Sequence, residues 1–240
     1  MSLRCLSERM TSVSIGKNMR PSVGRSYSTR NVHETAEAFF SEAMSNYIEQ
    51  DRQRPDKQWV NNILDGKSEK EGVIYEDPEF LVLFDTKKKN KVRNLQELQM
   101  YRESPAGAHV LGRDFVLHWL VLTRDTELRC IRDLTGDHVP LLERIQSTCE
   151  SLLLEYFGIE KNMIKIFAHY HPSVYQLHFH VDYPSGRMTG SHPSRVKSMH
   201  DILNNLKTDP MYYHHHTIEC PVRINQLLFK ISSGEMLKDN

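Results

Sequence analysis

The sequence is poor in cysteine, contains no long apolar run and carries no excess charge of either sign. Its four cysteines, Cys5, Cys130, Cys149 and Cys220, form no CxxC pair, which argues against a disulfide framework or a cysteine-rich zinc site and fits a reducing compartment. Apolar stretches such as FVLHWLVL at 115–122 are far shorter than the roughly 20 residues of a membrane-spanning helix. We therefore expect no interaction with the membrane interior.

The 240 residues include 31 basic side chains (lysine and arginine) and 31 acidic side chains (aspartate and glutamate). This balance produces no global field that would attract duplex DNA or an anionic membrane, so a nucleic-acid fragment would have to bind in a local pocket. Hydrophobic residues make up 39% of the chain, which is ordinary for a globular protein with a sizeable core.

Acidic residues are almost absent from the first thirty positions, where six lysines and arginines and seven serines accompany the single acid Glu8. No apolar segment of a secretory signal occurs there. A basic, serine-rich and acid-poor leader is typical of a mitochondrial transit peptide, and a disordered tail is the alternative. We assign residues 1–30 to such a leader.

Hydrophobic periodicity predicts an α+β fold, in which one long helix packs on a meandering antiparallel sheet and smaller helices flank it. The clearest helix has an apolar stripe from Leu141 to Leu153. Helices are predicted at 33–50, 59–67, 134–159, 195–206 and near the C-terminus, and strands at 72–85 (two, joined by a turn), 115–123, 163–170, 175–183 and 216–223. The segment 86–114 is predicted to be a long loop, with one helical turn at NLQELQMYR (94–102) as an option.

Histidines are concentrated in HYHPSVYQLHFHVD at 169–182. Side chains alternate along a strand, so Gln176, His178 and His180 are expected on one face, with His169 beside them if the two strands pair. Solvent-facing histidines, a metal site and a phosphate site are the three interpretations. A metal site needs three or more converging ligands, and no Cys, Asp or Glu is obviously placed to complete one. In a phosphate site, a neutral imidazole attacks phosphorus while neighbouring imidazoles stabilise the developing charge.

The run QLHFHVD at 176–182 resembles the His-φ-His-φ-His-φ-φ motif (φ, apolar) of the histidine triad nucleotide hydrolases and transferases, with Gln176 in place of the first histidine. Five ordered segments further resemble the scavenger mRNA decapping enzymes, a branch of that superfamily that hydrolyses m7GpppN left after mRNA decay. They are WVNNILDGKSE (59–69), EDPEFLVLFDTK (76–87), IRDLTGDHVPLLERI (131–145), HYHPSVYQLHFHV (169–181) and NNLKTDPMYY (204–213). The resemblance covers roughly residues 33–230.

The resemblance implies a histidine triad-like sheet and a metal-free, cofactor-free hydrolysis of the cap to m7GMP and a nucleoside diphosphate. It implies the following roles: His178 as nucleophile, His180, His169 and Ser173 as phosphate contacts, Trp59 stacked on the methylated base, Glu69 on its Watson–Crick edge, and Asp85 and Lys87 in the Asp-x-Lys positions beside the cap. Gln176 can hydrogen-bond a neighbour but cannot become cationic, so it weakens the triad without removing His178.

Elementary chemistry agrees with these implied roles. N7-methylated guanine is positively charged, so the face of Trp59 would attract it by a cation–π interaction of about 1–2 kcal/mol when desolvated. The carboxylate of Glu69 can accept from the N1–H and N2–H groups of guanine together. Lys87 can neutralise charge on the triphosphate.

Residues 31–58 are interpreted as a helical hinge or linker and residues 59–240 as the catalytic domain. In the family a separate N-terminal domain precedes the Trp59 segment, whereas 58 residues precede it in this sequence. The resemblance implies a homodimer that acts on the cap dinucleotide or short capped RNA in cytoplasm and nucleus, while the basic leader points to mitochondria. A non-catalytic cap-binding relative and a broader dinucleoside polyphosphate hydrolase are the alternatives.

Overall fold

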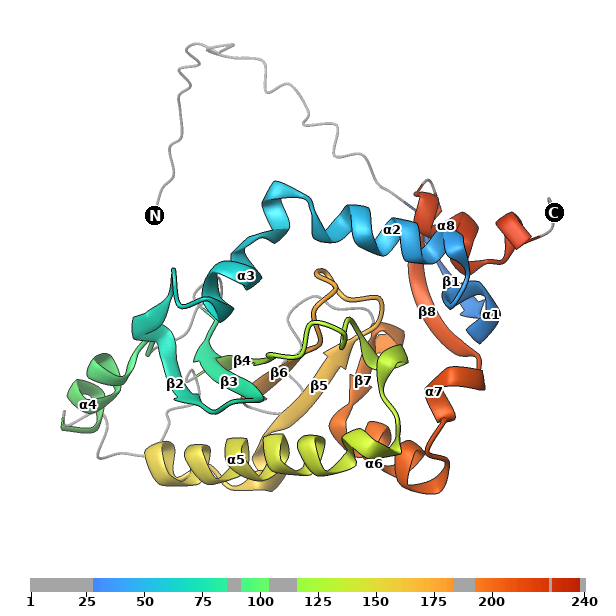
Figure 1. Cartoon of the computed structure of the whole chain (residues 1–240). Coiled ribbons are helices and arrows are strands. Elements are labelled where there is room, and N and C mark those ends of the chain that lie inside the picture. The colour runs from blue at the N-terminus through green and yellow to red at the C-terminus, as the bar shows by residue number, and fades with distance from the viewer. Residues whose placement is uncertain (1–27, 86–91, 104–115, 184–192, 225, 238–240) are drawn as a thin grey trace, which may run out of the picture.

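The computed structural model describes residues 28–85, 92–103, 116–183, 193–224 and 226–237, and it confirms the α+β fold (Figure 1). A six-stranded antiparallel sheet with the order β2-β3-β4-β6-β5-β7 forms its centre. The strands are β2 (Val73–Glu76), β3 (Phe80–Phe84), β4 (Leu117–Thr123), β5 (Lys165–His169), β6 (His178–Tyr183) and β7 (Val196–Ser198).

One face of this sheet packs against the long helix α5 (Val139–Phe157). Trp119 and Val121 of β4 and Phe179 and Val181 of β6 belong to the same buried cluster as the apolar stripe of the helix. That stripe consists of Leu142, Ile145, Cys149 and Leu153, as the periodicity predicts. The helix ends at Gly158, whose φ of +64° lies in the left-handed region that favours glycine.

The opposite face of the sheet carries a smaller apolar cluster and the polar residues of the site. Leu120 and Leu122 of β4 point to this side, because they alternate with Trp119 and Val121. Helix α3 (Trp59–Leu64) covers this cluster with Val60 and Ile63. In Figure 1, α3 and α5 accordingly lie on opposite sides of the sheet.

A second sheet pairs β1 (Thr29–Glu34) with β8 (Ile218–Arg223). The sequence predicted the strand at 216–223 but not its partner, because β1 alternates weakly and buries only Val32 and Glu34. The helix predicted at 33–50 is two helices, α1 (Ala36–Phe39) and α2 (Glu42–Arg52). They are separated at Ser41, whose hydroxyl accepts from the amide of Met44 as an N-cap.

The loop predicted at 86–114 contains a helix, α4 (Leu95–Glu103), and the remainder of the loop lies outside the described residues except for 92–94. The remaining helices are α6 (Met199–Thr208), α7 (Tyr212–His215) and α8 (Leu227–Ser232), with 3-10 turns at Pro55–Lys57, Lys70–Gly72, Ile131–Asp133, Gly136–His138, Lys161–Met163, Pro193–Arg195 and Glu235–Leu237. Among the described helices, none is both long and apolar enough to cross a membrane.

Candidate active site

Three imidazoles converge where β5 and β6 pair. His178 and His180 lie on β6, and His169 ends β5. The ring centroid of His180 lies 4.4 Å from that of His169 and 5.3 Å from that of His178. Phe167 stacks on His180 at 5.2 Å with 23° between the ring planes, which holds the central ring in place.

The backbone fixes the tautomer of His178. Its Nδ1 lies 2.7 Å from the carbonyl oxygen of Gln176, and a carbonyl can only accept, so the hydrogen is on Nδ1. Burial lowers the pKa of His178 below its usual 6.5, and the positive charge of Arg195 acts in the same direction, against the hydrogen bond to Gln176. His178 is therefore neutral near pH 7, with its lone pair on Nε2.

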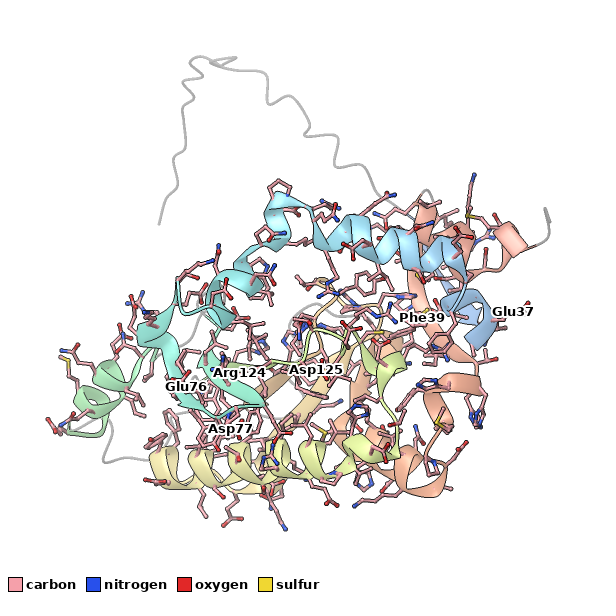
Figure 2. All side chains as sticks on the ribbon, viewed as in Figure 1. Glu37, Phe39, Glu76, Asp77, Arg124 and Asp125 are labelled. Atoms are coloured by element: carbon pink, nitrogen blue, oxygen red, sulfur yellow. The ribbon has the colours of Figure 1, made fainter. Side chains whose placement is uncertain are left out.

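Gln176 precedes β6, which begins at His178. Its buried side-chain amide donates to the carbonyl oxygens of Thr123 and Asp125, at 2.8 Å each. The intervening Arg124 donates to the carbonyl of Asp77 and pairs with Glu76, and Figure 2 shows this cluster at the edge of the sheet. Gln176 thus anchors the segment that leads into β6.

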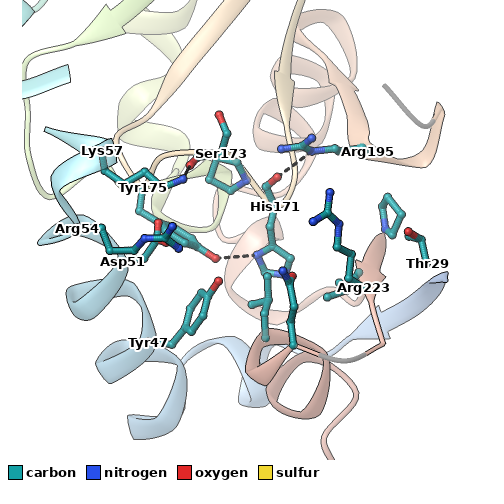
Figure 3. Close-up of a pocket in the computed structure, with 15 residues that line it drawn as sticks. Thr29, Tyr47, Asp51, Arg54, Lys57, His171, Ser173, Tyr175, Arg195 and Arg223 are labelled. Carbon is teal, nitrogen blue, oxygen red and sulfur yellow. Dashed lines mark hydrogen bonds and ion pairs between the residues drawn. The ribbon is translucent and has the colours of Figure 1, made fainter. Parts of the chain in front are cut away.

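Ser173 lies exposed in the turn between the two histidine strands, at the wall of a pocket of about 490 Å³ (Figure 3). The ammonium group of Lys57 donates to the carbonyl of Ser173, and Arg195 Nε donates to the carbonyl of His171 at 3.0 Å. Arg54 and Arg223 also line the pocket, against the single carboxylate Asp51. Burial and the charge of Arg223 lower the pKa of Arg195. The pocket is cationic and suited to an anion.

Trp59, the residue expected to stack on the cap base, lies on the same face of the sheet as the histidines. Trp59 begins α3, is half-buried and packs against the apolar cluster that contains Leu120 and Leu122. Those leucines stand opposite His180 and His178 in the ladder between β4 and β6. The shared face supports a continuous site from α3 to the imidazoles.

Of the other three residues expected beside the cap, the structure describes Glu69 and Asp85. Glu69 is half-buried immediately before the Lys70–Gly72 turn, with a φ of +54°. Asp85 directly follows β3 and is buried. Lys87 lies outside the described residues.

Two residues that the sequence did not assign to the site, His118 and Asp182, lie next to its histidines: His118 contacts His180, and Asp182 contacts His118. They stand directly opposite each other in the ladder between β4 and β6. Asp182 Oδ1 contacts His118 Nδ1, while His118 Nε2 lies 3.1 Å from His180 Nδ1 and 3.4 Å from Asp85 Oδ2. The signal for His118 was a polar residue inside the otherwise apolar run FVLHWLVL.

His171 belongs to a separate buried network beside the turn. Its Nε2 lies 2.8 Å from the carboxylate of Glu34, which also contacts Tyr170, Arg132 and Ser232. Burial alone would raise the pKa of Glu34, but the charge and hydrogen bond of His171, the hydrogen bond of Tyr170 and the charge of Arg132 together hold it below 4.5. This network joins β1 and α8 to the turn that carries Ser173.

Two groups among the described residues have side chains close enough together to hold a metal ion. One is Glu34, His171 and Cys220, and the other is Asp209, His215 and His216. Neither includes His178 or His180, so neither places a metal at the converging imidazoles.

Residues 114–195, which contain the three imidazoles, match the family model "Scavenger mRNA decapping enzyme C-term binding". Over this part the chain is similar to the scavenger mRNA decapping family. An m7GpppX diphosphatase of Schizosaccharomyces pombe is 32% identical over 192 residues, which cover 78% of this chain and 56% of the relative. The Homo sapiens enzyme of the same name is 28% identical over 178 residues, 72% of this chain and 47% of the relative.

The chain therefore spans about half the length of these curated relatives. Among solved structures, Hnt3 aligns with a TM-score of 0.41 and 18% identity, over 76% of this chain and 93% of that one.

Proposed function

We propose that this chain hydrolyses the m7GpppN cap to m7GMP and a nucleoside diphosphate through a nucleotidyl-histidine intermediate at His178. The observation that carries the proposal is the state of His178, which is buried, neutral and hydrogen-bonded through Nδ1 so that Nε2 holds the lone pair. A neutral imidazole nitrogen is the form that attacks phosphorus. The match to the family model and the relatives named m7GpppX diphosphatase support the same chemistry.

In the first step Nε2 of His178 attacks the phosphorus next to 7-methylguanosine. The P–N bond forms, the P–O bond to the rest of the triphosphate breaks, and the nucleoside diphosphate leaves. The imidazole becomes positively charged, and the Gln176 carbonyl at Nδ1 stabilises that charge. Water then attacks the same phosphorus and the P–N bond breaks. This releases m7GMP and restores neutral His178, while the proton lost by the water passes to solvent.

His180 and His169 are placed to stabilise charge on the phosphate oxygens during both steps, because their rings adjoin each other beside His178. The methylated base would stack on Trp59, with Glu69 as acceptor for its N–H groups and Asp85 and Lys87 beside the cap. The cationic pocket beyond Ser173, lined by Arg195 and Arg223, would take the departing nucleoside diphosphate. The geometry of the described residues supports this arrangement of the substrate.

The test is a product assay on m7GpppG and GpppG without added metal. The wild-type chain should release m7GMP, and His178→Ala should abolish the reaction. His200→Ala is the matched control, because His200 is an exposed histidine on α6 and should leave the rate unchanged. Intact m7GpppG after incubation with the wild-type chain, or equal rates for wild type and His178→Ala, would contradict the proposal.

A second candidate is a non-catalytic cap-binding relative, which the amide at position 176 favours because it cannot become cationic. It predicts m7GpppG binding that depends on Trp59 and Glu69 without any turnover. Release of m7GMP that depends on His178 would exclude it. Comparable rates on GpppG would instead indicate a broader dinucleoside polyphosphate hydrolase, because the methyl charge would then be unimportant.

A further inference from the structure

We propose that His118 is a positioning residue that acts as an imidazolium, held in place by Asp182 and Asp85. It donates a hydrogen bond to His180 and thereby fixes His180 in the tautomer that carries its hydrogen on Nε2. His180 then presents an N–H donor for a substrate phosphate oxygen. The role in catalysis rests on the proposed cap hydrolysis, whereas the hydrogen positions do not depend on it.

The four side chains are brought together by strand register. Asp85 follows β3 and its amide donates to the carbonyl of His118. His118 pairs with Asp182 across the ladder between β4 and β6. His180 precedes Asp182 by two positions and therefore points to the same side of the sheet. All four residues are between 5% and 8% exposed, so protein groups, not bulk water, determine where the hydrogens lie.

The acceptors around His118 determine its protonation. At Nδ1, the partner is the carboxylate of Asp182, so this nitrogen carries a hydrogen. Near Nε2 lie Asp85 Oδ2 at 3.4 Å and His180 Nδ1 at 3.1 Å. A doubly protonated His118 finds an acceptor for each N–H, the carboxylate of Asp182 at Nδ1 and His180 Nδ1 at Nε2, with Asp85 Oδ2 beside it. With both nitrogens protonated, His118 Nε2–H donates to His180, whose Nδ1 must then be the acceptor.

The consequence for His180 is a fixed direction of hydrogen bonding. A neutral imidazole that accepts at Nδ1 carries its hydrogen on Nε2. The stacked Phe167 ring fixes the plane in which this N–H points. A preorganised donor next to the nucleophile stabilises the charge that develops on phosphate oxygens without reorienting during the reaction.

A purely structural role would not require these residue types. Leu120 and Leu122 occupy the next two positions of the same strand face, and another leucine at position 118 would extend their apolar cluster. Burying two carboxylates costs stability unless a cation compensates them, and apolar replacements of buried ion pairs are often neutral or stabilising. A buried Asp–His–His chain that ends at the candidate phosphate site is therefore best explained by its effect on His180.

Nuclear magnetic resonance of the ¹⁵N-histidine-labelled full chain at pH 7.5 tests the hydrogen positions directly. His118 should show two protonated nitrogens, and His180 should show a protonated Nε2 with an unprotonated Nδ1. In Asp182→Asn, His118 should lose one of its two hydrogens. A neutral His118 or a His180 protonated at Nδ1 alone in the wild-type chain would overturn the proposal, and this measurement requires neither a variant nor activity.

The kinetic test compares two amides that imitate different nitrogens of His118. The amide of His118→Gln reaches the Nε2 position and can still donate to His180, whereas that of His118→Asn reaches only the Nδ1 position beside Asp182. We expect His118→Gln to retain kcat within about fivefold and His118→Asn to lose kcat on the order of 10- to 100-fold, the range seen when a group that orients an active-site ligand is removed. KM should change less than kcat in both.

Equal kcat losses in the two variants, or losses seen only in KM, would overturn the positioning role. If the wild-type chain shows no turnover of m7GpppG, the proposed function fails, while the resonance measurement still decides the state of His118 and His180. If His118→Asn fails to fold, the wild-type spectrum and His118→Gln decide the proposal.

Discussion

Replacement of Gln176 by leucine should destabilise the fold by about 2 kcal/mol, because leucine keeps the volume but removes both amide hydrogens. These hydrogens bind the carbonyls of Thr123 and Asp125 at 2.8 Å, and the chain is buried at this point. Each hydrogen bond contributes roughly 0.5–1.5 kcal/mol, so the pair accounts for about 1–3 kcal/mol. For a chain of this size 1 kcal/mol corresponds to about 2–4 °C, so Tm should fall by about 4–8 °C.

Urea unfolding followed by circular dichroism measures the change in free energy, and calorimetry measures Tm. Gln53→Leu is the control, because Gln53 is exposed and its side chain donates to Glu49 one helical turn away; its effect should stay within about 0.5 kcal/mol. The kcat of Gln176→Leu, measured well below its Tm, should also fall, because the Gln176 carbonyl that orients His178 loses its anchor. A free energy of unfolding for Gln176→Leu within 0.5 kcal/mol of wild type would refute the anchoring role.

Three further outcomes are expected. Because the pKa of His178 lies below 6.5, kcat/KM for m7GpppG should stay flat from pH 8 down to 6.5 and fall only at lower pH. The same shift in pKa should lower the free energy of unfolding as the pH falls through 6.5, because the unfolded chain binds the proton before the folded chain does. Trp59→Ala should raise KM for m7GpppG on the order of tenfold and that for GpppG much less, as steady-state kinetics on both substrates will show. Glu34→Gln should lower the free energy of unfolding by about 3–5 kcal/mol, because it leaves the buried cation Arg132 uncompensated. The control is Glu37→Gln, which should have little effect because Glu37 is exposed (Figure 2).

The parts of the fold with strong periodicity could be predicted from the sequence. The helix at 139–157 has a full apolar stripe, and the central strand at 117–123 is buried along its whole length. Strand β1 could not be predicted, because its pairing with β8 spans nearly the whole chain and only two of its six residues are buried. Within the loop predicted at 86–114 the sequence indicated only one helical turn, at 94–102, where α4 lies, because this segment is polar and buries few residues.

The site was predictable where one strand places its residues together and less so where different strands contribute. Alternation indicated that His178 and His180 share a face, and the hairpin brings His169 to them as expected. The contribution of His118 depends on which strand lies beside β6, and that order is a property of the sheet that no local pattern shows. His171, for which the sequence suggested no role, lies in a buried network because β1 supplies its partner Glu34 from a distant part of the chain.

The register of β6 gives a physical reason for the glutamine at position 176, where the histidine triad motif has its first histidine. Because side chains alternate, a slip of one residue would turn His178 and His180 toward α5 and bring Phe179 into the site. The register is fixed where the strand begins, by the side chain of Gln176 and by the Leu177 amide, which donates to the carbonyl of Leu128 at 2.7 Å. An amide can donate two hydrogens to two carbonyls at once, which a neutral imidazole cannot. Gln176 therefore cannot supply a cation at this position, but it secures the alignment on which the proposed nucleophile His178 and its neighbour His180 depend.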